Sequence, residues 1–286
     1  MPAALVFGAS GQIGRALLPR LQQQGWDVVA VSRETRHDHG TSWIVGALED
    51  LSAVPGRFDV VFSCGPLDRF AAWYAKHGTG IPRVVAFGST SVSVKQDSAD
   101  AGERDVAARL AKGETVVFEA ARRFGAAATI LRPTLVYGGG TDHTLSRVAA
   151  LARRWRLVPI PVDATGLRQP VHVDDLASAA MAVLDVPGAA GRAYALPGGE
   201  ALPWCEMVSR VVATLDPPSR VLPLPAGLFR MALALARMTG AARGFGGAVS
   251  ARLGDDLVFD PGPAAHDFGY APRSFQPGRG MFDAPR

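Results

Sequence analysis

The chain of 286 residues has little cysteine and little lysine. Its two cysteines, Cys64 and Cys205, and its six scattered histidines show no metal-ligand spacing and no disulfide framework, so we predict no metal site. Only three of the 30 basic residues are lysines. No dense basic run interleaved with aromatic residues is present, and we therefore expect no nucleic-acid partner.

Long apolar runs are also missing. The most apolar late stretch, residues 222–238, is interrupted by Pro223, Pro225, Arg230 and Arg237, and so it cannot span a bilayer. The first apolar segment begins at residue 4 and leads at once into glycines, which is not the pattern of a signal peptide. We therefore expect a cytoplasmic protein with no membrane partner.

The chain does have a regular glycine pattern near its start. Residues 4–14 read ALVFGASGQIG, with glycines at Gly8, Gly11 and Gly14. A strand over 4–7 would enter a tight turn at Gly8, Gly11 would let the main chain approach a pyrophosphate, and Gly14 would let the next helix pack on the strand. The strand before the glycines and the amphipathic run after them favour a dinucleotide site over a merely structural turn.

Strand and helix signals alternate over the first half of the chain. The apolar pattern predicts strands over 4–7, 26–32, 43–45, 58–63, 83–87 and 128–131, and helices over 13–24, 70–77 and 105–124. Continuously apolar strands separated by helices are typical of an α/β fold with a doubly wound parallel sheet of the Rossmann type. We assign this domain to residues 1–165.

The pattern changes after Pro133. We expect a helix over 145–154, a proline-broken segment at 159–161, a short strand at 169–173 and a helix at 176–184. Proline and glycine clusters then separate short helices. We predict that residues 166–286 form a smaller C-terminal lobe that covers the substrate, with part of its sequence returning to the first domain.

The end of the second predicted strand bears on the choice of cofactor. An acidic residue there binds the adenosine ribose 2′-OH of NAD(H), whereas arginine suits the 2′-phosphate of NADP(H). The strand ends in Ser32 and Arg33, with Arg36 close behind. Because a guanidinium can hold a phosphate through two parallel hydrogen bonds, we predict that NADP(H) is preferred over NAD(H). The alternative is that both arginines simply belong to an exposed loop.

Five segments, in order, carry a resemblance to a known family. They are the glycine turn, the strand Asp59–Ser63, the run Phe87–Ser91, the pair Arg132-Pro133 with Tyr137-Gly138, and the segment from Arg168 through His172-Val173 to Asp175–Ala177. The ending from Phe259 to Arg273 is also similar. The chain therefore resembles the extended short-chain dehydrogenase/reductases, specifically the NAD-dependent epimerase/dehydratase family.

The resemblance implies a set of binding residues. Those expected around the adenosine and its phosphates are Gly8, Ser10, Gly11, Gln12, Ile13, Gly14, Ser32 and Arg33, with Leu48 beside the adenine. Those expected near the ribose and the nicotinamide are Cys64, Gly65, Pro66 and Pro133. Arg168 stands where the family grips the diphosphate of a nucleotide sugar, although a surface arginine before a strand is the alternative.

The family's acid–base pair, a Tyr-x-x-x-Lys one helical turn apart, is absent. The residues four positions after the four tyrosines are glycine, threonine, glycine and serine. The family's spacing from a helix glutamate to the Arg-Pro pair fits Glu114 and Arg132, and counting back puts Val106 and Leu110 at the positions of the tyrosine and the lysine. Thr90 matches the hydroxyl-bearing third member.

Three interpretations stay open. Tyr137, near the expected nicotinamide end, is a replacement acid or merely a packed aromatic side chain. Alternatively, bound water or the substrate supplies the proton during hydride transfer, or the protein binds NADP(H) without turnover as a regulatory or structural protein. We predict an oxidoreductase or epimerase-like enzyme, monomeric or homodimeric, acting on a nucleotide-sugar-like or other anionic small molecule, with Thr90 and Tyr137 as catalytic residues.

Overall fold

The computed structural model describes residues 1–36, 40–52, 54–142, 144–238 and 253–283. The chain groups into two compact units. The first comprises Met1–Thr134, Val173–Leu196 and Asp260–Pro272, and the second comprises Leu135–His172, Pro197–Phe259 and Arg273–Arg286. In the described ranges, no helix combines the length and the apolar character needed to cross a membrane.

A seven-stranded sheet forms the centre of the first unit, and every pair of neighbouring strands in it is parallel. The order is β11-β6-β5-β4-β1-β2-β3. The strands are β1 (Ala3–Phe7), β2 (Asp27–Ser32), β3 (Thr41–Val45), β4 (Val60–Ser63), β5 (Arg83–Phe87), β6 (Ala127–Pro133) and β11 (Arg192–Leu196). The predicted doubly wound parallel sheet is confirmed.

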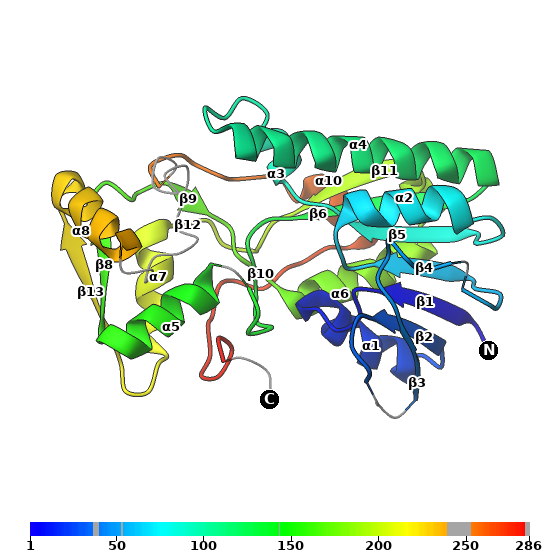
Figure 1. Cartoon of the computed structure of the whole chain (residues 1–286), viewed down its shortest axis with the longest axis horizontal. Coiled ribbons are helices and arrows are strands. Elements are labelled where there is room, and N and C mark those ends of the chain that lie inside the picture. Colours follow the sequence, from blue (N-terminus) through cyan, green and yellow to red (C-terminus); the bar gives the residue numbers. More distant parts are fainter. Residues whose placement is uncertain (37–39, 53, 143, 239–252, 284–286) are drawn as a thin grey trace. The chain divides into compact units, whose positions relative to one another are not determined.

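Helices cover both faces of this sheet. Figure 1 shows α1 (Gln12–Gln23) and α6 (Val173–Ala182) on one face, with α2 (Leu67–His77) and α4 (Ala101–Phe124) on the other. The remaining helices of the first unit are α3 (Ser91–Val94), the short 3₁₀ turns η1 (Val183–Asp185) and η2 (Pro187–Ala189), and α10 (Gly262–Phe268). Both faces of the sheet are therefore buried, which explains why its strands are continuously apolar.

Aromatic side chains fill the core between the sheet and α2. The ring of Phe7 lies 4.5 Å from that of Trp73 and 5.8 Å from that of Phe70, measured between centroids. Tyr74 is fully buried, and its ring stacks on that of Phe70. These contacts come from one face of α2, so the amphipathic pattern of that helix fixes it against the sheet.

Helix α4 starts four residues before the position predicted from the sequence. The side chain of Asp100 accepts a hydrogen bond from the backbone N–H of Glu103 at 3.0 Å and caps the first turn, which is what an N-cap aspartate does. The helix ends at Phe124, and the C-cap residue after it, Gly125, has a φ of 66° in the left-handed region. Glycine adopts this conformation without steric cost.

Three small two-stranded sheets lie in the described part of the second unit. Strand β7 (Val136–Tyr137) pairs with β10 (Val171–His172), β9 (Leu167–Arg168) with β12 (Leu202–Pro203), and β8 (Leu157–Pro161) with β13 (Arg220–Leu224). Among its described residues, the helices are α5 (Leu145–Trp155), α7 (Trp204–Ala213) and α8 (Ala226–Met238). Residues of α5 and α7 supply much of the core, together with Tyr137, Ile160 and Phe275.

Three predictions for the secondary structure are wrong in detail. The segment 159–161 is part of a strand despite Pro159 and Pro161, because β8 pairs with β13 alone among the described strands and its other edge needs no N–H donors. The strand predicted over 169–173 is instead two short strands, β9 and β10, separated by Gln169 and Pro170. The seventh strand of the large sheet, β11, was not predicted.

Candidate functional site

A pocket of about 250 Å³ lies at the carboxyl ends of β1, β2 and β4 in the first unit. The connections that leave β1 and β4 run to opposite sides of the sheet, and such a reversal leaves a crevice where ligands of doubly wound proteins bind. Its lining residues are Phe7, Gly8, Ser10, Gly11, Val31, Ser32, Arg33, Gly46, Ala47, Leu48, Glu49, Cys64, Gly65, Pro66 and Arg69. Nine of the predicted cofactor-binding residues are thus brought together.

The glycine turn has the close contacts that the sequence predicts. Gly8 has a φ of 68°, and a Cβ there would lie 2.7 Å from the backbone of Cys64 and Gly65. A Cβ on Gly14 would lie 2.4 Å from the carbonyl oxygen of Gly8. Helix α1 can therefore sit directly against the turn only if both positions are glycine.

The start of α1 faces this turn with an uncapped backbone. Gly11 is the N-cap residue, is extended, and provides no side-chain cap for the first N–H groups. Free N–H groups and the positive end of the helix dipole favour a negatively charged ligand. The 12-residue helix and the open pocket at its start fit a dinucleotide pyrophosphate.

Charged side chains gather beyond the end of β2, where Arg36 forms an ion pair with Glu34 at 3.6 Å. Ser32 is buried, and its Oγ accepts a hydrogen bond from the backbone N–H of Glu34 at 3.2 Å. Arg33 is exposed and lines the pocket. Burial and then the charge of Arg36 lower the pKa of Arg15. The Nε of Arg36 is itself buried and lacks a hydrogen-bond partner among the described residues.

Two charged residues of this pocket, Glu49 and Arg69, were not singled out from the sequence. Glu49 and Arg69 both line the pocket and form an ion pair of 2.6 Å with half-exposed side chains. They come from the loop after β3 and from α2, which are about 20 residues apart in the chain.

Cys64 forms part of the pocket wall together with Gly65 and Pro66. As a residue Cys64 is only partly buried, but burial of the thiol raises its pKa to about 12. The thiol therefore stays neutral near pH 7 and contributes an uncharged surface to the pocket.

Four predicted cofactor residues do not line the pocket. Ile13 and Gly14 are buried in the first turn of α1, and Gln12 begins that helix. Pro133 is buried at the end of β6, where its carbonyl oxygen accepts bonds from the N–H of Thr90 at 3.2 Å and from its hydroxyl at 3.3 Å. Their predicted roles in binding stay predictions.

Helix α4 carries apolar side chains at the two positions reached by counting back from Glu114. Val106 and Leu110 are both half-buried, and Leu110 packs against the core of the first unit. Glu114 itself is buried and pairs with Arg132 on β6, with Nε donating to Oε1 at 2.8 Å. This face of α4 contains a buried ion pair but no tyrosine or lysine beside it.

Tyr137 lies in the core of the second unit. The residue is fully buried, and its ring meets those of His172 and Phe275 edge-on, with centroids 5.0 Å and 4.8 Å away. A Cβ at Gly138, whose φ is 97°, would lie 2.3 Å from Nε2 of His172. The glycine after Tyr137 therefore lets the imidazole pack against this part of the chain.

Arg168 is also buried in the second unit, with 7% of its surface exposed. Its Nη1 donates to the carbonyl oxygens of Leu167 at 2.8 Å and Asp255 at 2.6 Å, and the guanidinium lies 5.8 Å from the ring centre of Trp204. A surface arginine before a strand is therefore excluded. Its predicted grip on a diphosphate stays a prediction.

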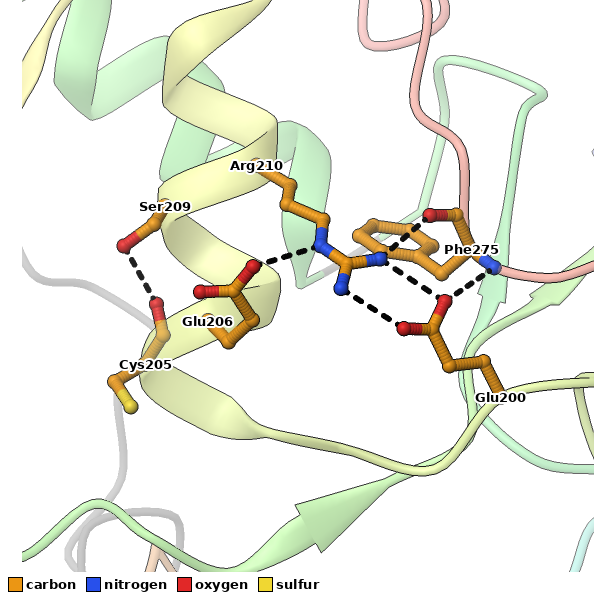
Figure 2. Close-up of polar contacts among 6 residues, drawn as sticks. All are labelled: Glu200, Cys205, Glu206, Ser209, Arg210 and Phe275. Atoms are coloured by element: carbon orange, nitrogen blue, oxygen red, sulfur yellow. Dashed lines mark hydrogen bonds and ion pairs between the residues drawn. The ribbon is translucent and has the colours of Figure 1, made fainter.

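The second unit also contains a polar cluster around Arg210 that the sequence did not predict. Figure 2 shows Arg210 of α7 between the carboxylates of Glu200 and Glu206, with a further bond to the carbonyl oxygen of Phe275. Glu200 also accepts a bond from the N–H of Phe275 at 3.1 Å. The cluster joins the C-terminal segment to α7, and we refer to it as the clamp around Arg210.

Three comparisons with known proteins agree with this architecture. The chain is 22% identical over 227 residues to the mitochondrial NADH dehydrogenase (ubiquinone) 1 alpha subcomplex subunit 9 of Dictyostelium discoideum, covering 73% of this chain and 63% of that subunit. The chain therefore spans less than two thirds of the length of that relative. It is 29% identical over 255 residues to the 2-alkyl-3-oxoalkanoate reductase of Stenotrophomonas maltophilia, covering 75% of this chain and 76% of that enzyme.

Among solved structures, MoeE5 in complex with UDP-glucuronic acid and NAD shares the fold, with a TM-score of 0.70 and 23% identity over 96% of this chain and 94% of MoeE5. The sequence profile of the NAD dependent epimerase/dehydratase family matches residues 4–67 and 72–196. Those residues make up well over half of the chain and include the glycine turn. The chain therefore belongs to the NAD-dependent epimerase/dehydratase family.

Proposed function

We propose that this protein binds a nicotinamide dinucleotide in the pocket at the carboxyl ends of β1, β2 and β4, and that it prefers NADP(H). The observation that carries the proposal is the joint lining of one pocket by the glycine turn, by Ser32 and Arg33, and by Leu48. These groups suit a pyrophosphate, a 2′-substituted ribose and an adenine, respectively.

The preference for NADP(H) rests on charge at the end of β2. No carboxylate occupies the position of Ser32 or Arg33, where NAD(H)-selective proteins place one. Arg33 lines the pocket, and its guanidinium can hold a 2′-phosphate through charge-assisted hydrogen bonds. Arg36 is ion-paired with Glu34 at 3.6 Å and does not line the pocket, so the preference rests on Arg33.

We further propose an oxidoreductase or epimerase-like activity on a nucleotide-sugar-like or other anionic substrate with a carbonyl or hydroxyl group. When bound, the nicotinamide supplies hydride transfer. UDP-glucuronic acid with NAD in MoeE5, and the name of the Stenotrophomonas reductase, support this range of substrates. We propose Tyr137 as the proton donor and Thr90, whose hydroxyl lies beside Pro133, as a second catalytic residue. Arg168 is the group that recognises the anion of the substrate.

A second candidate is NADP(H) binding without turnover, in a regulatory or structural role. The observation that favours it is the pair of half-buried apolar side chains on α4, Val106 and Leu110, at the positions counted back from Glu114. An apolar pair cannot exchange a proton. The Dictyostelium relative, which is named as a subunit of a larger assembly, is compatible with this candidate.

The cofactor proposal is tested by measuring NADPH and NADH affinities of the full chain by calorimetry. We expect NADPH to bind about ten-fold tighter or better, and Arg33→Asp to reverse the order. Arg122→Asp, an exposed position on α4, is the matched control and should leave the ratio unchanged. An unchanged ratio in Arg33→Asp would remove Arg33 as the source of the preference while leaving the dinucleotide site in place.

Turnover is tested separately, by following NADPH consumption with 3-oxo acids, NADPH formation from NADP⁺ with UDP-glucose and UDP-glucuronic acid, and formation of the epimeric sugars by chromatography. Activity that disappears in Tyr137→Phe, with unchanged NADPH affinity, supports the enzymatic proposal. Activity that survives in this variant contradicts the role of Tyr137. Tight NADPH binding with no activity on any of these compounds favours the second candidate.

A further inference from the structure

Exposed apolar side chains are concentrated in the second unit. Eight of the ten exposed large hydrophobic residues among those described lie there, and only Met1 and Val45 lie in the first unit. Three of the eight come from one helix, α8, in which Leu228 is 50% exposed and Met231 and Leu235 are each 58% exposed. Such a concentration marks an interaction surface more often than scattered single residues do.

These three residues form a stripe along α8. They are spaced three and four positions apart, which places them on one side of a helix. Phe229 of the same helix instead packs against the core of the second unit, and α8 contacts β8 and β13. The helix is thus held by one side and shows an apolar stripe, Leu228, Met231 and Leu235, on another.

The charge of the second unit indicates what covers this stripe. The unit contains 14 arginines and eight acidic residues, a formal net charge of +6, whereas the first unit has a net charge of −2. Helix α8 itself contains Arg230 and Arg237 and no acidic residue. Two copies of so positive a unit would repel each other, whereas an anionic surface would attract it.

We propose that α8 docks the protein on an anionic phospholipid bilayer, with Leu228, Met231 and Leu235 inserted among the headgroups and upper acyl chains. A helix that lies on a membrane needs one apolar face and positive charge nearby, not the length required to span it. Residues 222–238 cannot span a bilayer, but they have the apolar face and the positive charge that lying on a membrane requires. The proposal replaces the sequence-based expectation of no membrane partner and does not depend on the proposed enzymatic function.

The test is sedimentation of the full chain with lipid vesicles. We expect binding to phosphatidylcholine vesicles that contain about one third phosphatidylglycerol, weaker binding to phosphatidylcholine alone, and loss of binding as salt is raised. Replacing the stripe by Leu228→Ser, Met231→Ser and Leu235→Ser together should weaken binding by about ten-fold or more. The single variant Met231→Ser should give a smaller decrease in the same direction.

The matched control is Val45→Ser with Val258→Ser, which removes exposed apolar side chains outside α8. It should bind vesicles as the unchanged chain does, and thermal unfolding should be the same for all variants because every substituted residue is exposed. Absence of vesicle binding, or equal loss in the control, would overturn the proposal. Self-association that the triple variant abolishes, without vesicle binding, would identify a second copy of the chain as the partner instead.

Discussion

Glu114 and Arg132 join α4 to β6 through a two-pronged ion pair in which the glutamate side chain is only 7% exposed. The pair fixes the position of α4 along the sheet. It therefore also fixes the positions of the residues in the helical turns that precede the glutamate. Gly88 makes room for the carboxylate, since a Cβ there would lie 3.2 Å from Oε1 of Glu114.

Removing the carboxylate should leave the Arg132 guanidinium partly buried without its partner. We expect Glu114→Ala to lower the free energy of unfolding by about 3 kcal/mol, measured by urea denaturation. Glu119→Ala, an exposed position on the same helix, is the control and should change stability by less than about 0.5 kcal/mol. Equal effects of the two substitutions would show that the ion pair does not hold α4.

The glycine turn offers a second test. A methyl group at residue 14 would lie 2.4 Å from the carbonyl oxygen of Gly8 and 2.6 Å from Cα of Ala9, so the backbone must move. We expect Gly14→Ala to lower stability by about 1–3 kcal/mol and to abolish NADPH binding. Gly188→Ala, where a Cβ meets nothing within 4 Å, should leave both properties unchanged. NADPH affinity that survives in Gly14→Ala would place the dinucleotide elsewhere.

The central sheet could be predicted from the sequence because its strands are short continuous apolar runs. β5 matches its predicted bounds, 83–87, and β1 and β4 differ only at their first residues. β11 was missed because its short apolar run, residues 193–196, contains two alanines and no β-branched residue. Its membership of the sheet also depends on pairing with β6, about 60 residues earlier in the chain. The pairing of β8 with β13 was also not predicted, because Pro159, Pro161 and Pro223 interrupt the apolar pattern of the two strands.

The candidate site was predictable where its residues lie in a local motif. Gly8, Ser32 and Cys64 each end or follow one strand, and parallel strands bring their carboxyl ends to the same edge. Contacts set by tertiary structure were not predictable. Nothing near Arg210 in the sequence indicates that it bonds to the backbone of Phe275, 65 residues away.

The thiol of Cys64 provides a chemical test of the pocket. Because burial raises its pKa to about 12, almost none of it is thiolate at mildly alkaline pH, and the thiolate is the reactive form. We expect iodoacetamide to modify Cys64 very slowly in the folded chain, as measured by peptide mass spectrometry, and to modify it readily after denaturation. Rapid labelling of Cys64 in the folded chain would contradict a desolvated thiol. Cys205, the other partly buried cysteine, is the internal comparison.

The clamp around Arg210 should make stability depend on pH in the acidic range. Hydrogen bonds from Arg210 hold the pKa of Glu200 below its ordinary value of 4.5. The unfolded chain therefore takes up a proton at a higher pH than the folded one. The stabilisation is present above the ordinary value and is lost as pH falls through the lowered pKa of the folded state. Because Glu200 and Arg210 are about a third exposed, we expect about 1 kcal/mol or less.

Glu200→Gln removes the titrating group and should flatten that part of the pH dependence. Denaturation measured between about pH 6 and pH 3 should show the difference in stability between the unchanged chain and the variant shrinking as pH falls. Glu206→Gln is the matched control, since Glu206 bonds to the same guanidinium through Nε alone and is more exposed; its effect should be smaller. A difference for Glu200→Gln that stays constant over this range would mean that the carboxylate contributes through shape and not through charge.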